Sequence, residues 1–219
     1  MKAVARFSLA ALALGLVAAP ASAQLLGLPV VFAPASAGIT IGGMFGRGLN
    51  DASGKANSAG GMLTYGGGMF QVGAGASYFD FDLAKTISFG GNVGVNLPLG
   101  PSLPVKIMIV GGASYASKNG VKNLFIPAGV TFGFNVPSTS VAVTPWVSPQ
   151  IRYSRVDPGT GTTFSGTDFG GSGGVSIGLP MGVGFDLALD YTNVSGGSPF
   201  LVGAGIHYTI KTPGSGAGM

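Results

Sequence analysis

Cysteine and glutamate are absent from this chain, and histidine occurs once. Without cysteine there is no disulfide and no thiolate metal site, and one histidine among dispersed aspartates offers no metal-ligand spacing. Charged residues make up only 8% of the 219 residues, against roughly a quarter in ordinary globular domains. Lys2 and Arg6 contribute two units of the formal net charge of +4, and the other charges are scattered. This distribution argues against a nucleic-acid partner, and we expect no cofactor and no bound metal.

Long hydrophobic runs are also missing after the first two dozen residues, although 46% of the chain is hydrophobic and the mean hydropathy is +0.51. A membrane helix needs about 18 or more consecutive apolar residues. A membrane β-barrel needs apolar residues only at alternate positions, because its other face is turned to the lumen. High hydropathy without a hydrophobic helix therefore favours a barrel.

Residues 1–23 have the pattern of a secretory signal. Lys2 and Arg6 form a basic start, an apolar stretch follows, and Ala21-Ser22-Ala23 provides a small-residue cleavage site. Cleavage there makes Gln24 the new N-terminus. The alternatives are a short core helix and an uncleaved anchor.

The rest of the chain alternates between apolar and polar residues with a period of two, which is the period of a β-strand. In the last such stretch, 199–211, the even positions from Phe200 to Ile210 are apolar, while the odd positions include His207 and Lys211. The same pattern predicts ten strands. They cover 38–47, 58–66, 69–80, 84–97, 105–117, 123–136, 140–155, 168–179, 182–193 and 199–211.

The connections between these strands alternate in character. Four are rich in glycine or proline and mostly short, whereas those at 48–57, 81–84, 118–122, 156–167 and 194–198 are more polar. Tight turns at one end and longer loops at the other are typical of outer-membrane barrels. We expect an all-β fold, an antiparallel up-and-down transmembrane barrel of about 10 strands, with 8 or 12 as alternatives. The predicted organisation is a signal peptide at 1–23, a periplasmic lead-in at 24–37, the barrel at 38–211 and a flexible Gly-rich tail at 212–219.

Three prolines lie inside predicted strands, at Pro127, Pro145 and Pro149. A closed barrel has no free edge where the missing N–H of proline is harmless. The sequence therefore predicts bulges at these positions, or a break of the 140–155 strand near Pro149.

Aromatic residues mark both ends of the apolar face. Four tyrosines recur at steps of 37 or 38 residues near the longer loops, and a second set lies near the short turns. Two aromatic girdles around an apolar band are selected by a membrane interface. The predicted girdle residues are Tyr78, Tyr115, Tyr153, Tyr191, Phe70, Phe134, Phe185 and Tyr208.

The opposite face carries polar and charged residues among many glycines, and we expect it to line a lumen. Buried in a soluble core, each unpaired polar group would cost about 1–3 kcal/mol. Arg152 and Asp190 are expected opposite Gly170 and Ser172 and should form a lumenal salt bridge, either structural or a selectivity element. The predicted lumen-lining residues are Lys106, Arg152, Asp186, Asp190, His207, Trp146 and Gln150.

His207 and Asp186 are expected directly opposite each other on adjacent strands. With Ser176 or Ser172 nearby, they would allow a hydrolase interpretation. However, a barrel hydrolase needs its serine on the histidine near the outer leaflet, and His207 lies towards the periplasmic end. We therefore assign no catalytic residue and expect no enzyme.

Over residues 38–211 the chain resembles the small outer-membrane β-barrel family, the group that includes opacity-like and OmpW-like surface proteins. The resemblance rests on the signal sequence, the alternation, and the stretches Asn123–Phe134 and Thr144–Tyr153. The family usually ends on an aromatic residue recognised during assembly, whereas here a Gly-rich tail follows Tyr208. The resemblance implies a bacterial outer-membrane location, with outer-membrane lipid and the periplasmic chaperone and barrel-assembly machinery as partners.

Three functions follow from these expectations. The first is a narrow passive channel for small solutes. The second is a structural or surface-interaction barrel with a closed lumen, since Phe79, Phe125, Met108 and Trp146 also point inward. The third is a lipid-modifying enzyme. Neither the solute nor the oligomeric state follows from the sequence.

Overall fold

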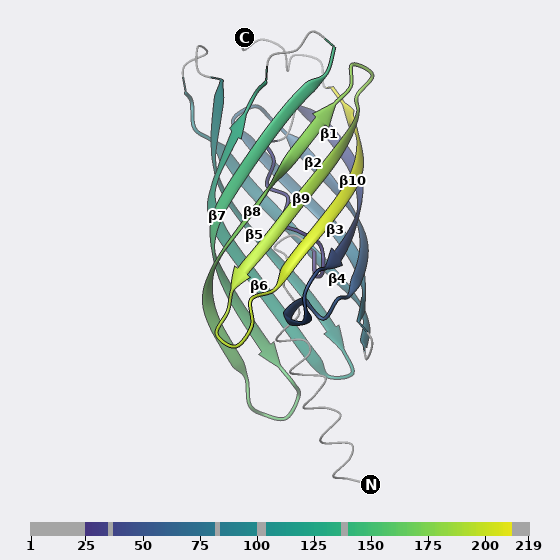
Figure 1. Ribbon diagram of the computed structural model, residues 1–219, viewed down its shortest axis with the longest axis vertical. Coiled ribbons are helices and arrows are strands. Elements are labelled where there is room, and N and C mark those ends of the chain that lie inside the picture. The colour runs from purple at the N-terminus through teal and green to yellow at the C-terminus, as the bar shows by residue number, and fades with distance from the viewer. Residues whose placement is uncertain (1–24, 35–36, 82–83, 100–103, 137–139, 212–219) are drawn as a thin grey trace.

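The two-residue alternation produces ten antiparallel strands that close into one barrel, in which β1 pairs with β10 (Figure 1). This confirms the predicted fold class and strand number. The computed structural model describes residues 25–34, 37–81, 84–99, 104–136 and 140–211, so the predicted signal peptide and tail lie outside the described residues. The strands are β1 (Gly38–Gly48), β2 (Asn57–Gly66), β3 (Phe70–Phe81), β4 (Ala84–Asn96), β5 (Val105–Lys118), β6 (Val121–Phe134), β7 (Ala142–Asp157), β8 (Phe164–Gly178), β9 (Val183–Asn193) and β10 (Phe200–Ile210).

The barrel has two distinct ends. We call the end where β1 starts and β10 finishes the turn end, and the opposite end the loop end. The loop end is at the bottom of Figure 1 and carries the one-turn 3₁₀-helix η1 (Asp51–Ser53) between β1 and β2. No helix in the described residues is long and apolar enough to span a membrane.

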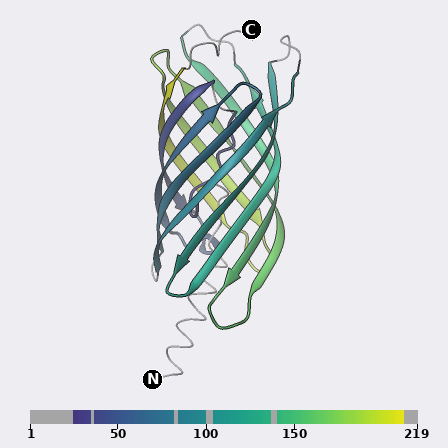
Figure 2. The same cartoon turned by 180° about the vertical axis from the view of Figure 1, so that it is seen from behind.

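The β7–β8 hairpin begins its second strand at Phe164 rather than at the predicted residue 168. Residues 164–167 are exposed on both faces, because this hairpin projects beyond the rest of the loop end (Figure 2). A stretch that packs on neither side has no need for apolar alternation. The sequence signal is therefore weak where the strand begins.

The proline prediction was wrong. β7 runs unbroken from Ala142 to Asp157 through both of its prolines. On the β6–β7 side, pairing skips the position of Pro149 and resumes with the same register, from Gly129 opposite Gln150 to Phe132 opposite Val147. Each proline lacks only the one N–H that would have joined one neighbouring strand. The barrel tolerates this local loss without a bulge.

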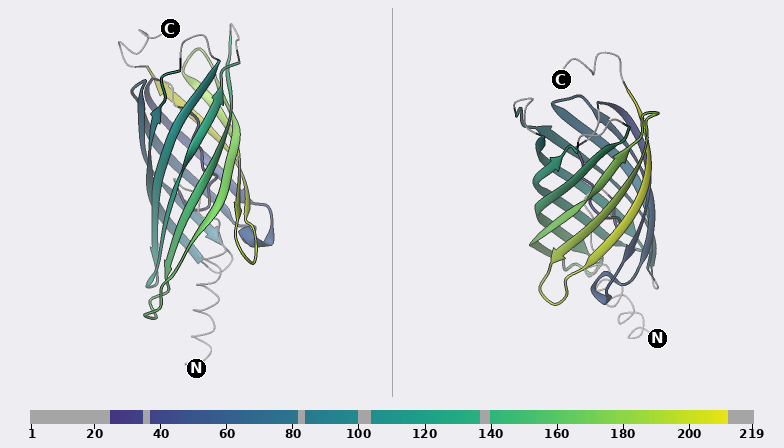
Figure 3. Two further views of the ribbon diagram at one scale, coloured as in Figure 1. Left: turned by 90° about the vertical axis from the view of Figure 1, so that its left-hand side faces the viewer. Right: turned by 45° about the horizontal axis from the view of Figure 1, so that its top comes forward.

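The outer face of the wall is apolar and exposed, and the inner face is buried. Seven of the eight predicted girdle aromatics point outward with 43–50% of their surface exposed, and Tyr153 is partly exposed. Between the two aromatic rows, the outward side chains of the described strands carry no charge. The tilted view in Figure 3 shows the strands as one continuous wall around the lumen.

Candidate functional site in the barrel lumen

The lumen is occupied by the chain's own residues 25–34, which precede β1. Figures 1 and 2 show this segment in purple inside the wall of strands. We call residues 25–34 the lumenal segment. It falls within the stretch 24–37 that was predicted to lead into the barrel, and its side chains are among the most buried of the described residues. Those exposed by 3% or less include Leu25, Leu26, Leu28, Val30 and Phe32.

Side chains of the wall bind the backbone of the lumenal segment. The Leu26 N–H donates to Ser88 Oγ at 2.8 Å, and Ser77 Oγ donates to the Leu26 carbonyl at 2.9 Å. Further along, the Val30 N–H donates to Asp190 Oδ2 at 3.1 Å. A buried backbone group without a partner is costly, and an isolated segment cannot use a β-ladder. Lumenal hydroxyl and carboxylate groups take the place of a neighbouring strand.

A turn at Gly27 brings the lumenal segment against the wall. Gly27 has φ of 80°, its carbonyl accepts from Ser58 Oγ, and a Cβ at this position would lie 2.1 Å from Phe79 Cδ2. Only glycine combines this left-handed backbone with such a close ring contact. Phe79 is 1% exposed and forms part of the packing around the segment.

Wall glycines leave the space that the lumenal segment fills. A Cβ on Gly60 would lie 2.8 Å from Leu28 Cδ1, and one on Gly203 would lie 2.8 Å from Pro29 Cγ. At the turn end, a Cβ on Gly133 would lie 2.9 Å from Pro34 Cγ. Three different strands are therefore shaped to this segment. Its course, from Ser88 in the loop-end half to Gly133 near the turn end, crosses most of the barrel.

The lumen is drier than the sequence predicted. The inward apolar residues of the wall do not stand alone in a wet channel but join the lumenal segment in one cluster. The buried cluster contains Leu26, Val30, Phe32, Ala56, Phe79, Met108, Val110, Ala116 and Phe125. Apolar contacts of this kind stabilise by roughly 25 cal/mol per Å² of buried surface. The lumenal segment is thus part of the hydrophobic core.

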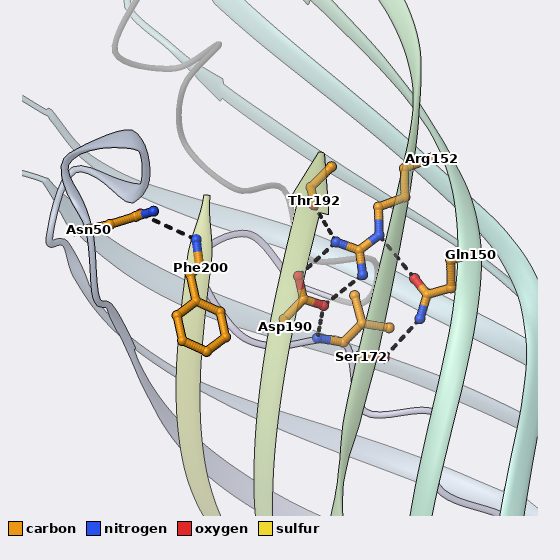
Figure 4. A network of polar contacts seen from close by, with 8 residues as sticks. Asn50, Gln150, Arg152, Ser172, Asp190, Thr192 and Phe200 are labelled. Atoms are coloured by element: carbon orange, nitrogen blue, oxygen red, sulfur yellow. Dashed lines mark hydrogen bonds and ion pairs between the residues drawn. The ribbon is translucent and has the colours of Figure 1, made fainter. Parts of the chain in front are cut away.

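The predicted Arg152–Asp190 pair is present and fully buried (Figure 4). Arg152 Nη1 lies 2.7 Å from Asp190 Oδ1, Nη2 lies 2.8 Å from Oδ2, and the two side chains are 0% and 1% exposed. This is the bidentate geometry in which a guanidinium binds a carboxylate best. Gln150 accepts from Arg152 Nε and donates to Ser172, while Thr192 accepts from Arg152 Nη1. Asp190 also holds Val30, so the pair couples the wall to the lumenal segment.

The register around this pair differs in part from the expected one. Asp190 lies opposite Ser172 as predicted, but Arg152 lies opposite Asp168, and it is Gln150 that lies opposite Gly170. The Arg152 side chain therefore reaches over Gly170 to its partner. A Cβ at Gly170 would lie 2.7 Å from Arg152 Nε and 2.8 Å from the Tyr191 carbonyl oxygen.

The turn-end half of the lumen contains a cavity of about 190 Å³ beside the lumenal segment. Met44 and Met62 line it together with a polar cluster, His207, Asp186 and Ser176. His207 Nδ1 lies 2.6 Å from Asp186 Oδ2, and the two side chains are 18% and 17% exposed. This half is therefore less tightly packed than the half that holds Arg152.

The contact between His207 and Asp186 forms despite a register error of two residues in the prediction. Asp186 lies opposite Gly205, and His207 opposite Gly184, so the pair meets diagonally. Ser176 donates to the second oxygen of Asp186 rather than binding the histidine. A nucleophilic serine must give its proton to the histidine, and this arrangement does not place it there. Among the described residues, no cluster of His, Asp or Glu is suited to a metal ion.

The remaining predicted lumen residues lie apart from these clusters. Lys106 is exposed near the turn end of β5. Trp146 on β7 is 4% exposed, and its Nε1 has no hydrogen-bond partner. Sequence reasoning missed the lumenal segment and the hydrogen bonds that Ser58, Ser77 and Ser88 make to it. The available signal was an apolar stretch between Gln24 and β1 whose Pro29 and Pro34 prevent regular strand pairing.

No protein-family model and no curated protein sequence matches this chain. Solved structures do match it. The β domain of the Bordetella autotransporter BrkA aligns with a TM-score of 0.52 and 13% identity, covering 80% of this chain and 100% of that one. The NalP translocator domain from Neisseria meningitidis (TM-score 0.44, 12% identity, 80% and 90% covered) and the outer membrane protease OmpT from Escherichia coli (0.42, 12%, 79% and 94%) also align. At these identities the likeness concerns the fold alone, which is the closed β-barrel of bacterial outer-membrane proteins.

Proposed function

We propose that this chain is an integral outer-membrane β-barrel whose lumen is closed by its own lumenal segment, residues 25–34, so that it serves as a closed structural or surface barrel. The outward face supports the membrane location. Its exposed residues are apolar between two aromatic rows, and a charge there would cost about 2–4 kcal/mol at the bilayer midplane. Fractionation of cell envelopes tests this part, and recovery as a soluble periplasmic protein would contradict it.

The closure rests on one observation, the burial of residues 25–34 within the lumen. Ten strands at the usual spacing and tilt give a backbone radius of about 10 Å. A segment with leucine, valine and phenylalanine side chains fills much of that space. Because Leu26 and Val30 are hydrogen-bonded to three strands of the wall, the segment is held in place rather than merely enclosed.

Conductance across planar lipid bilayers tests the closure. We expect the purified wild-type barrel to give no steady ion current at moderate voltage. A variant lacking residues 25–34 should give discrete current steps, because the glycines and serines that face the segment would then line an aqueous passage. A wild-type current as large as that of the deletion variant would contradict the proposal.

A second variant guards against failure of the deletion variant to assemble. The chain has no cysteine, so Pro29→Cys with Gly203→Cys introduces the sole thiol pair where Pro29 Cγ lies 2.8 Å from the position of a Gly203 Cβ. Disulfide formation in the folded protein, without any current, would support the closed lumen. Failure of the pair to oxidise would place the segment elsewhere.

The passive channel remains the second candidate, and one observation favours it. The wall behind the segment has glycine or serine at Gly46, Gly60, Ser58, Ser77 and Ser88, which is smooth and polar enough for water once the segment leaves. Brief wild-type openings that a disulfide between positions 29 and 203 abolishes would favour a channel that opens by release of the segment.

A further inference from the structure

A groove on the outer wall of the barrel has no role in the closed lumen. It lies at the loop end of β3, β4 and β5 and has a volume of about 520 Å³. Its lining changes in character along the strands, from charged at the rim to apolar towards the middle of the barrel. The residues that matter are Tyr78, Lys85, Ile87, Phe89, Tyr115 and Lys118.

The rim of the groove is cationic. The Lys85 side chain is 64% exposed and lies 3.2 Å from Asp80, and Lys118 Nζ donates to the Lys85 carbonyl, which places the two lysines at one spot. On the next strand, Lys122 lies opposite Ser117, which also lines the groove. Asp80 lies beside Lys85, and Asp157 on β7 lies opposite Lys122, so the three lysines exceed these two carboxylates by one positive charge. The rim therefore presents positive charge to an incoming group.

Below the rim the groove is aromatic and then apolar. Tyr78 lies opposite Ile87 across β3 and β4, and Phe89 lies opposite Tyr115 across β4 and β5. Phe89 is 63% exposed and Ile87 53%, so neither is covered by other parts of the described chain. A tyrosine level between cations and apolar side chains matches the order of a lipid monolayer, from headgroup to acyl chain.

We infer that this groove binds one anionic lipid of the leaflet at the loop end, with its phosphate headgroup on Lys85 and Lys118 and an acyl chain along Phe89 and Ile87. The inference rests on the proposed membrane location. A soluble phosphate would use only the rim, and an apolar molecule would use only the lower part. The groove joins both, which selects an amphiphile with a phosphate.

Lipid retention by the intact barrel tests the site. The purified chain is reconstituted in nanodiscs of equal parts phosphatidylglycerol and phosphatidylcholine, released in the mass spectrometer, and the bound lipid is identified. We expect wild type to retain one phosphatidylglycerol. Lys85→Gln with Lys118→Gln should weaken that preference roughly 30-fold, since each lysine near a membrane surface contributes several-fold to anionic-lipid binding. Phe89→Ala should weaken retention of both lipids.

Matched controls remove the same groups elsewhere. Lys106→Gln deletes a lysine at the turn end, and Phe185→Ala deletes an outward aromatic of that end; both should leave retention unchanged. Equal loss in the controls, equal retention of the two lipids, or full displacement of the lipid by glycerol 3-phosphate would overturn the inference. A chain that does not enter nanodiscs at all would instead remove the proposed membrane location.

Discussion

The loop-end and turn-end halves of the lumen are built differently. In the loop-end half, Arg152 and Asp190 are buried within a hydrogen-bond network, and Ala56, Phe79, Ala116 and Phe125 pack in the apolar cluster that includes the lumenal segment. In the turn-end half, His207 and Asp186 remain partly exposed beside a cavity of about 190 Å³. A buried ion pair stabilises only when every group in it is satisfied. The contrast indicates that the seal of the barrel depends on one half and tolerates change in the other.

The largest loss of stability is expected when the buried ion pair of Arg152 and Asp190 is broken. Arg152→Ala leaves the Asp190 carboxylate buried without its partner and should lower the free energy of unfolding by about 3–5 kcal/mol. The single tryptophan, Trp146, reports unfolding in urea by its fluorescence. Arg152→Met with Asp190→Leu should recover much of the loss, and the remainder is the unpaired Val30 N–H. A loss no greater than that of the turn-end variants would remove the contrast between the halves.

A smaller loss of stability is expected when a methyl group is added at Gly170, over which the Arg152 side chain passes. Gly170→Ala would place a methyl group 2.7 Å from Arg152 Nε and 2.8 Å from a backbone oxygen. Overpacking of this kind costs about 1–3 kcal/mol, measured by the same urea titration. Gly61→Ala is the matched control, because the nearest atom to its Cβ lies at 3.5 Å. Equal behaviour of the two variants would show that Arg152 is free to move aside.

In the turn-end half, a substitution should lower the free energy of unfolding by a still smaller amount. Asp186→Asn weakens the contacts to His207 and Ser176, but water reaches these groups and replaces part of what is lost. We expect a loss of about 1 kcal/mol and no change in bilayer conductance. Conductance steps in this variant would mean that the turn-end half contributes to the seal.

The smallest effect is expected outside the lumen, in η1. The hydrogen bond and charge of Lys55 lower the pKa of Asp51 below its ordinary value of 3.8, and the two groups lie 2.7 Å apart on the surface. A lowered folded-state pKa adds stability above the unfolded value, and this is lost as the pH falls through the folded value. Asp51→Asn should leave the urea midpoint unchanged at pH 7, because solvent screens exposed pairs. A clear shift at pH 7 would show a larger role for η1.

The strands of the barrel wall could be predicted because their outward positions are apolar, which gives each strand an alternation with a period of two. Nine of the ten predicted strands begin within two residues of the observed ones; only β8 differs by more, beginning four residues earlier, where its hairpin leaves the apolar band. Pro149 misled the prediction, since the loss of one ladder bond is less costly than shifting the register of every residue beyond it.

The lumen was less predictable, because inward side chains have no common pattern. The pairing of Arg152 with Asp190 followed from opposite charges on nearby strands, and it survived a register error because arginine is long. The lumenal segment could not be placed from its own residues. Its location depends on the space that Gly60, Gly133 and Gly203 leave along the wall. The significance of these glycines becomes clear only when the lumenal segment is known to lie against them.

The direction of residues 25–34 constrains the order in which the molecule is assembled. The segment runs towards the turn end, and β1 then returns alongside it to the loop end, where Gly48 meets Leu201 of β10. Phe79 and Phe125 are 1% and 4% exposed, so the lumenal segment lies in an interior that is already filled by side chains of the wall. We therefore expect the seam between β1 and β10 to close around residues 25–34 once these are seated, which makes the lumenal segment a template for closure.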